Sequence, residues 1–234
     1  MFNTETREGV LALEREETRW LSTGWDGGFA EGDRAFNVTV PEGWNPDDLD
    51  SYVAERLEDA GFERESGPVL LTGVAQRHAR VARCGPVAAA ATVGVSNPAA
   101  LPMDPAGGSL PNDPEPVAGT VNVFVGTTRA LDDAALANLV AVAAEAKTAT
   151  LLDAVGFPGT TTDAVVAATD PAGERAAFSG SATRVGAAAR ACVRDAVRAS
   201  YASRYGDDDP PESVDDARHG VRTDVESDVF VPGE

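Results

Sequence analysis

One apolar helix constrains what this chain can fold into. It is expected to run from about Leu131 to Val155, because apolar residues recur there at spacings of three or four and a Gly and a Pro follow. In an α-helix these apolar residues share one face, and such a face needs a partner in the core. The face consists of Leu136, Val140, Ala143, Lys147, Leu151 and Ala154.

Lys147 lies in the middle of this apolar face, and it is the one lysine among 19 basic residues. Two interpretations stay open: a structural ion pair or a lysine that snorkels at the edge of the core, and a lysine of the functional site. Because arginine is larger, planar and permanently charged, the choice of lysine favours the second. We expect Lys147 to be at least partly buried and to contact Asp163, another motif carboxylate or the ligand pocket.

The remaining pattern predicts a sheet with helices on it. Short β-prone segments come in groups separated by helices, which predicts an α+β fold, or a mixed α/β one. We expect a single domain over residues 1–205, with a mixed sheet covered by helices, and an acidic, loosely attached tail over 206–234. Strands are expected at 9–14, 18–24, 34–40, 68–74, 78–85, 87–95, 120–128 and 163–169, helices at 45–61, 131–155 and 181–205, and loops at 24–33 and 96–119.

The charge balance limits the possible partners. Asp and Glu outnumber Lys and Arg by 38 to 19, which gives a net charge of −19. Such acidic, lysine-poor composition is typical of proteins from salt-accumulating cytoplasms, where salt screens the repulsion between carboxylates. Nucleic acid is not an expected partner, because its binding needs clustered Lys and Arg.

The sequence carries no signal for a membrane, for export or for a metal. The apolar run 86–95 is too short to span a bilayer, and the N-terminus lacks a basic region followed by an apolar one. We therefore expect a cytoplasmic protein. Cys84 and Cys192 form no CxxC pattern, and His78 and His219 belong to neither an HExxH motif nor a GxSxG-type triad, so neither a metal site nor a His-based nucleophile is expected.

The chain also carries six short motifs in a defined order. They are WLSTGWDGGF at 20–29, ATVGVSNPA at 91–99, GTVN at 119–122, EAKTA at 145–149, GTTTDAV at 159–165 and SGSATRVG at 179–186. Over residues 8–200 the sequence thereby resembles the adenosylcobinamide amidohydrolases, archaeal and bacterial enzymes of cobinamide salvage. Several ordered motifs at fitting distances are more specific than any one of them.

The resemblance implies hydrolysis of the amide that joins the aminopropanol arm of adenosylcobinamide to the corrin ring. The products are adenosylcobyric acid and aminopropanol, and the acid can re-enter coenzyme B12 synthesis. The corrinoid is then the substrate and no cofactor is expected. The expected partner is this small molecule, with no nucleic acid and no membrane, and an oligomer is possible.

Amide hydrolysis needs an activated nucleophile, donors for the oxyanion and an acid for the leaving amine. Lys147, Glu145 and Asp163 are the catalytic candidates, although Asp163 is equally consistent with a turn-capping residue. Hydroxyls, amides and glycines of the motifs are expected to contact the carboxamide-rich corrin. These substrate-binding candidates are Ser22, Gly27, Gly28, Asn37, Ser96, Asn97, Asn122, Thr160, Thr161 and Thr162.

Two other functions stay open on the sequence alone. One is a non-catalytic corrinoid-binding protein on the same scaffold, since binding and turnover would use the same pocket. The other is hydrolysis of a different small-molecule amide by a salt-adapted α+β domain. Activity on adenosylcobinamide, with mass detection of adenosylcobyric acid, separates all three.

The net charge of −19 predicts a salt-dependent stability. Raising KCl from low to molar concentration screens the repulsion between carboxylates, so the denaturant midpoint of unfolding is expected to rise. Midpoints measured at several KCl concentrations test this. A midpoint that does not move would refute the salt-adapted interpretation.

Overall fold

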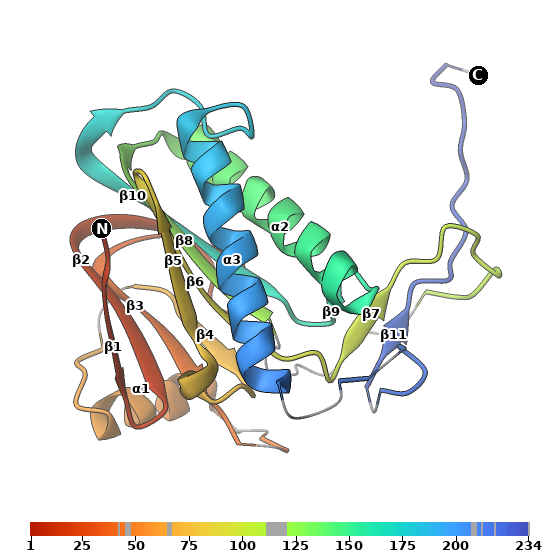
Figure 1. The fold of residues 1–234 in the computed structure, drawn as a ribbon, viewed down its shortest axis with the longest axis horizontal. Helices are drawn as coiled ribbons and strands as arrows, with labels where there is room; N and C mark the ends of the chain where they lie inside the picture. The colour runs from red at the N-terminus through yellow and green to blue at the C-terminus, as the bar shows by residue number, and fades with distance from the viewer. Residues whose placement is uncertain are drawn as a thin grey trace.

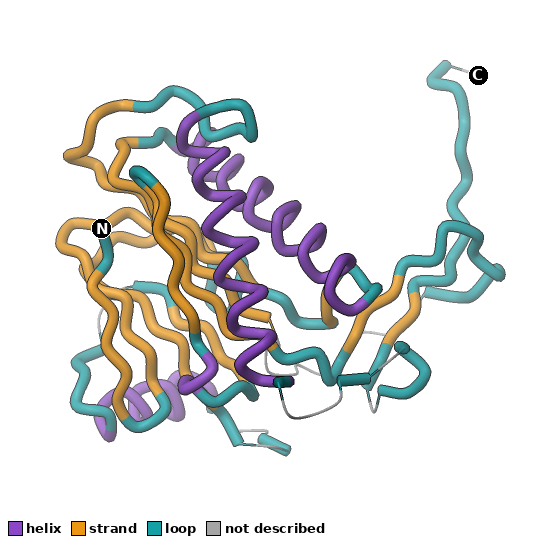
Figure 2. Tube along the Cα trace, in the orientation of Figure 1, coloured by secondary structure: helices purple, strands orange, loops and turns teal. Residues whose placement is uncertain are grey.

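A computed structural model of the chain describes residues 1–234 except 42, 45–47, 65–66, 111–120, 207–209, 212, 218 and 234. The described residues form a mixed eight-stranded sheet in the order β4-β3-β2-β10-β8-β6-β5, with β1 beside β2, and helices cover it (Figures 1 and 2). The predicted α+β fold is confirmed. The strands of this sheet are β1 (Asn3–Arg7), β2 (Val10–Ser22), β3 (Gly28–Thr39), β4 (Val69–Thr72), β5 (Arg80–Cys84), β6 (Val87–Val93), β8 (Val121–Ala130) and β10 (Ala164–Arg175). The helices are α1 (Leu49–Asp59), α2 (Asp133–Val155), α3 (Arg184–Tyr205) and the short 3-10 helix η1 (Gln76–His78).

Helices α2 and α3 lie side by side on one face of the β10–β8–β6 half of the sheet (Figure 1). Strands β8 and β10 are parallel neighbours, and α2 is the crossover between them. Helix α2 is long and apolar enough to cross a membrane, but half of its most apolar 18-residue stretch is buried inside the fold. It is the central element of a core that also contains Val121, Val123, Val125, Val165, Val193 and Val197.

The sheet curls so that its two halves enclose a second core. Strands β3 and β8 are separated in the sheet by β2 and β10. Yet Asn122 on β8 donates to the side chain of Asn37 on β3 and to the carbonyl of Leu71 on β4, at 2.8 and 3.0 Å. These contacts bring β3 and β4 over the face opposite α2 and α3. The enclosed side chains include Phe2, Leu13, Trp20, Leu70, Phe124 and Val166.

Helix α1 covers the outer face of β2, β3 and β4. Its buried Val53 and Leu57 pack against residues such as Phe36 on that face. Asp48 caps its N-terminus by accepting the backbone N–H groups of residues 50 and 51. The first three residues of the helix expected at 45–61 lie outside the described residues.

Three expectations for these elements are wrong. The strands expected at 9–14 and 18–24 are one strand, β2, which bends at a bulge where Glu17 adopts a left-handed φ of 51°. The loop expected at 24–33 is short, because β3 begins at Gly28 and pairs with Ser22. On α2, Ala154 is exposed rather than part of the apolar face, since the end of the helix at residues 152–154 is exposed.

The buried face of α2 is also wider than expected, because the helix packs against both the sheet and α3. Leu139, Val142 and Ala146 are buried in addition to Leu136, Ala143, Lys147 and Leu151. Val140 is only partly buried. A stripe at spacings of three and four describes contact with one partner, and a helix with two partners buries more than one stripe.

A second, smaller sheet joins segments that are far apart in the sequence. Its order is β11-β7-β9, where β7 is Pro98–Ala100, β9 is Gly159–Thr160 and β11 is Val221–Arg222. It lies beyond the end of α2 (Figure 1). The C-terminal tail therefore pairs with the loop after β6, and that loop pairs with the turn after α2. The boundary at residue 205 and the loose attachment of the tail stay predictions.

Candidate functional site

Lys147, Asp163 and Thr160 form one buried polar cluster. The ammonium of Lys147 pairs with Oδ2 of Asp163, and the hydroxyl of Thr160 donates to Oδ1 of the same carboxylate. The backbone N–H of Thr160 also donates to Oδ2, at 3.1 Å. The side chains of Lys147 and Asp163 are 10% and 13% exposed. The prediction that Lys147 is at least partly buried is confirmed, and of the partners expected for it the structure shows Asp163.

The crossover from β8 to β10 positions these three residues. Lys147 lies on α2, the chain turns back through Thr160 in β9, and Asp163 directly precedes β10. Because Asp163 accepts the N–H of a residue three positions earlier, it holds the turn in shape. It therefore has the turn-forming contact expected of a structural Asp and, in addition, the contact with Lys147.

Gly159 lets the ion pair approach the backbone. A Cβ atom at this position would lie 2.5 Å from Oδ2 of Asp163 and 2.7 Å from Nζ of Lys147. Any larger residue would therefore compete with both charged groups for the same space. Gly159 was not among the predicted site residues, because only the close approach of α2 to the turn gives it a role.

A second polar cluster lies at the same end of the sheet, on its enclosed face. Asn37 donates to Thr92 Oγ1 at 2.9 Å and accepts from Asn122 at 2.8 Å. Gln76 of η1 lies 3.5 Å from the Asn37 amide and donates to Thr39 Oγ1 at 3.1 Å. Of these residues the sequence analysis named Asn37 and Asn122. Thr92 carries a signal that it did not use, since it is the polar member of an alternation with Ala88 and Ala90.

Asn122 has one unused hydrogen-bonding atom. Its Nδ2 group faces the oxygen atoms of Asn37 and Leu71, so the orientation of the amide is set by acceptors. Its Oδ1 atom is buried and accepts from none of the described residues. A buried polar atom without a partner costs about 1–3 kcal/mol, and an N–H group of a ligand would satisfy it.

The two clusters are neighbours through the backbone but face opposite sides of the sheet. Asn122 on β8 pairs in register with Ala164, the residue after Asp163. The side chain of Ala164 lies in the enclosed core, whereas Asp163 meets Lys147 on the side of α2. The clusters therefore lie at the same end of the sheet, where β8 and β10 begin.

The turn between β2 and β3 lies at the same end of the sheet, where β8 and β10 begin. Ser22 pairs with Val166 of β10, and its hydroxyl accepts the N–H of Gly24 at 3.1 Å. Gly27 is required for packing, because a Cβ there would lie 2.6 Å from the carbonyl oxygen of Ser22. Gly28 has a φ of 109° and open space beside it. These three predicted residues shape the turn and leave one side of it accessible.

The loop after β6 borders the first cluster. The carbonyl of Asn97, a buried residue, accepts the N–H of Thr161 at 3.0 Å. Ser96, Thr161 and Thr162 are exposed or partly exposed. The loop thus holds the Thr-rich turn next to the ion pair, and its polar side chains face outward from that turn.

Glu145 lies away from both clusters. Its side chain is 63% exposed and pairs with Arg190 of α3 at 3.2 Å. Two positions along a helix point to nearly opposite sides, so Glu145 and Lys147 do not meet. The motif at 179–186 is also remote from them, since Thr183 caps α3 by accepting the N–H of Gly186 near the beginning of α2.

Neither the cysteines nor the histidines enter the two clusters. Burial raises the pKa of the Cys192 thiol to about 11, so this group stays protonated near neutral pH. Cys84 is exposed on β5. His78 has Nδ1 3.1 Å from the hydroxyl of Ser203, and burial lowers the pKa of His78. His219 is exposed in the tail.

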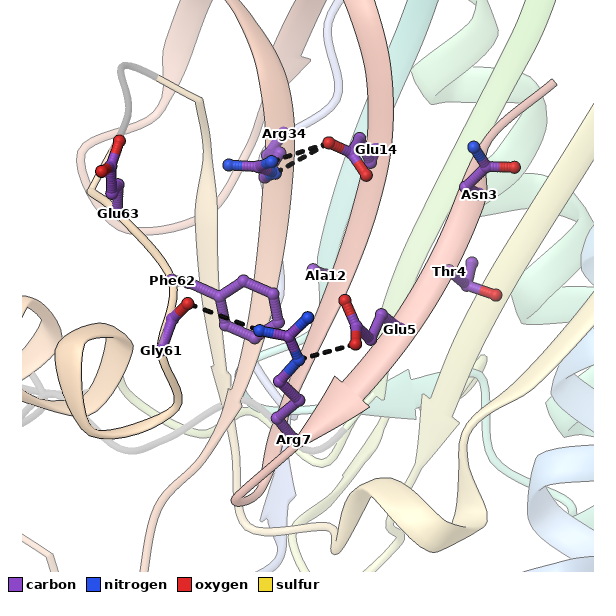
Figure 3. A pocket seen from close by; sticks show the side chains of 10 residues that line it. All are labelled: Asn3, Thr4, Glu5, Arg7, Ala12, Glu14, Arg34, Gly61, Phe62 and Glu63. Carbon is purple, nitrogen blue, oxygen red and sulfur yellow. Dashed lines mark hydrogen bonds and ion pairs between the residues drawn. The ribbon is translucent and has the colours of Figure 1, made fainter.

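A concavity of about 640 Å³ lies on the outer side of β1, β2 and β3 (Figure 3). Its charged groups face one another: Arg7 pairs with Glu5, and Arg34 pairs with Glu14. None of the predicted site residues lines it. Because the two polar clusters lie elsewhere, we do not assign it to the functional site.

Comparison with known proteins points to one family. The sequence profile of the adenosylcobinamide amidohydrolase family matches residues 1–209. A curated adenosylcobinamide amidohydrolase of Halobacterium salinarum is 64% identical over 233 residues, 99% of this chain and 100% of the relative. Another, of Methanosarcina mazei, is 32% identical over 149 residues, 63% of this chain and 68% of the relative. The Halobacterium relative supports the salt-adapted source that the composition predicts.

Replacing Gly159 is expected to disrupt the first cluster. Gly159→Ala places a methyl group against Asp163 and Lys147, so we expect a loss of about 1–3 kcal/mol in the free energy of unfolding, as for other overpacked sites. Gly73→Ala is the matched control, because a Cβ there meets nothing within 4 Å. Denaturant unfolding at one fixed KCl concentration measures both variants. Equal stability of the two would contradict the described approach of the ion pair to the turn.

Proposed function

Because the chain belongs to the adenosylcobinamide amidohydrolase family, we propose that it hydrolyses the aminopropanol amide of adenosylcobinamide at the cluster of Lys147, Asp163 and Thr160. The products are adenosylcobyric acid and aminopropanol, in corrinoid salvage toward coenzyme B12. The observation that carries the assignment of the site is the buried contact of a hydroxyl, a carboxylate and an ammonium at one end of the sheet. No metal ligand is needed for the steps below.

The first step uses the hydroxyl of Thr160. It already donates to Asp163, so the carboxylate can take its proton while Oγ1 attacks the carbonyl carbon of the substrate amide. The ammonium of Lys147 lies at the same carboxylate and supplies a positive charge for the oxyanion that forms. In a site shielded from water such a charge acts more strongly than at the surface.

The second step releases the amine. The C–N bond breaks as the leaving nitrogen takes from Asp163 the proton that Thr160 gave up, and the corrinoid acid stays on Thr160 as an ester. Water then attacks the ester carbon, Asp163 takes the proton of the water, and the bond to Oγ1 breaks. Adenosylcobyric acid leaves and Thr160 regains its hydroxyl, so atoms and protons balance over the cycle.

The second cluster suits the amide arms of the corrin. The free Oδ1 atom of Asn122 can accept an N–H group of a carboxamide, and Asn37 fixes the orientation of Asn122. Seven other predicted residues lie on the turns around the same end of the sheet, and this position supports their proposed roles in substrate binding. They are Ser22, Gly27, Gly28, Ser96, Asn97, Thr161 and Thr162.

A pair of variants separates catalysis from stability at the ion pair. Lys147→Met alone leaves the buried carboxylate of Asp163 without its cation, and it is expected to lose about 3–5 kcal/mol of stability. Lys147→Met with Asp163→Asn removes both charges, so we expect a stability closer to that of the parent. In molar KCl, with adenosylcobyric acid detected by mass, both variants are expected to lose on the order of a hundredfold or more in rate.

A folded double variant with the parental rate would refute the catalytic role of the ion pair. Glu145→Gln tests whether Glu145, the remaining catalytic candidate, takes part in the reaction. Because Glu145 lies on the exposed side of the same helix, we expect this variant to keep the rate of the parent protein. A parent protein that binds adenosylcobinamide without turnover would instead support the non-catalytic corrinoid-binding function.

Thr160 can be tested by substitution and by trapping. Thr160→Val removes the hydroxyl and keeps the shape of the side chain, so turnover is expected to fall by about a hundredfold or more, whereas Thr160→Ser keeps the nucleophile and is expected to retain measurable turnover. Acid quenching during turnover, followed by mass spectrometry, is expected to show the parent chain carrying the corrinoid acyl group on the peptide with Thr160. An active Thr160→Val variant would show that water attacks the amide directly.

A further inference from the structure

Exposed apolar side chains gather on two segments of this acidic protein. Among the described residues, seven of the twelve large hydrophobic side chains that are exposed lie between 101 and 110 or between 221 and 231. Met103 is 79% exposed and Leu101 is 58% exposed. Single exposed apolar residues are ordinary, but neighbouring ones mark a contact surface, and Leu101 and Met103 line the same groove.

The small sheet holds these two segments together. The N–H of Thr223 donates to the carbonyl of Ala100 at 2.9 Å, and Asp224 accepts the N–H groups of Ala106 and Gly108 through its side chain and its carbonyl. The tail therefore braces the loop that follows β7. Between them lies an open groove of about 440 Å³, lined by Leu101, Pro102, Met103, Pro105, Val225 and Glu226.

The same sheet connects the groove to the proposed nucleophile. Pro98 of β7 pairs with Thr160 of β9, and Leu101 follows Pro98 by three residues. Extended chain rises about 3.3 Å per residue, so the groove begins on the order of 10 Å from Thr160. A ligand in the groove with a flexible amide arm can thus reach the cluster of Thr160, Asp163 and Lys147.

We propose that this groove binds the corrin ring of the substrate while the aminopropanol amide reaches Thr160. The inference rests on the proposed function, because it takes the corrinoid as the ligand. A corrin is a broad ring whose rim carries methyl groups and amide arms, so it needs an extended apolar surface next to polar groups. Leu101, Met103 and the neighbouring prolines offer that surface, and the thioether of Met103 adapts to an irregular ring.

The test compares corrinoid binding by two variants of the full-length protein. Leu101→Gln with Met103→Gln makes the groove polar without touching the catalytic cluster. Phe178→Gln is the control, because Phe178 is 74% exposed and adjoins Ser179, which bonds to Ala135 at the far end of α2. Equilibrium dialysis with adenosylcobyric acid in molar KCl measures binding in the absence of turnover. Sedimentation in the analytical ultracentrifuge measures the oligomeric state.

We expect the groove variant to bind adenosylcobyric acid at least tenfold more weakly than the parent, and the control to bind within twofold. The KM for adenosylcobinamide is expected to rise by a similar factor while kcat changes less than twofold. Parental affinity in the groove variant, or no measurable binding by the parent, overturns the proposal. A change of oligomeric state with unchanged affinity also overturns it, since the groove is then an interface between copies.

The outcomes separate this proposal from the proposed function. A parent protein that binds the acid through the groove but does not hydrolyse adenosylcobinamide overturns the function and keeps the groove. Hydrolysis with parental KM and affinity in the groove variant overturns the groove and keeps the function.

Discussion

The buried ion pair between Lys147 and Asp163 is the interaction on which the arrangement of the site depends. It joins the middle of α2 to the beginning of β10, and the carboxylate also holds the turn that carries Thr160. Two charges removed from water stabilise a fold only when their geometry and remaining hydrogen bonds are good, and here the backbone and hydroxyl of Thr160 supply those bonds. The side chains that hold α2, β9 and β10 in their relative positions are therefore also the side chains proposed to act on the amide.

The curvature of the sheet gives the site its second half. A flat sheet in this strand order would keep β3 and β8 two strands apart, and Asn37 would not meet Asn122. The bulge in β2 and the core around Trp20 and Phe124 bend the sheet until those amides touch. The result is one sheet edge with a charged cluster on the side of α2 and an amide cluster on the enclosed side.

Much of the fold was accessible from the sequence, and part of the site was too. The order of strands and helices, the position of α2 and the contact of Lys147 with Asp163 follow from spacing, from turn residues and from the place of a lone lysine on an apolar face. Glu145 stood in the same motif as Lys147, but the sequence could not show that α3 offers it an arginine partner at the surface. Thr92 and Gln76 escaped notice because each acquires its contacts from a segment far away in the chain. Gly159 escaped notice because only the approach of α2 to the neighbouring turn gives it a role.

The class of fold, the acidic surface suited to high salt, the family and the one core lysine all follow from the amino-acid sequence. These are properties of composition, of local periodicity and of motifs, and short-range physics is enough to express them. Which side chains meet depends on long-range contacts. The sheet curls, Oδ1 of Asn122 has no partner among the described residues, and the C-terminal tail pairs with the loop beside Thr160. Those contacts join residues from 51 to more than 110 positions apart, and no local pattern encodes a distance of that kind.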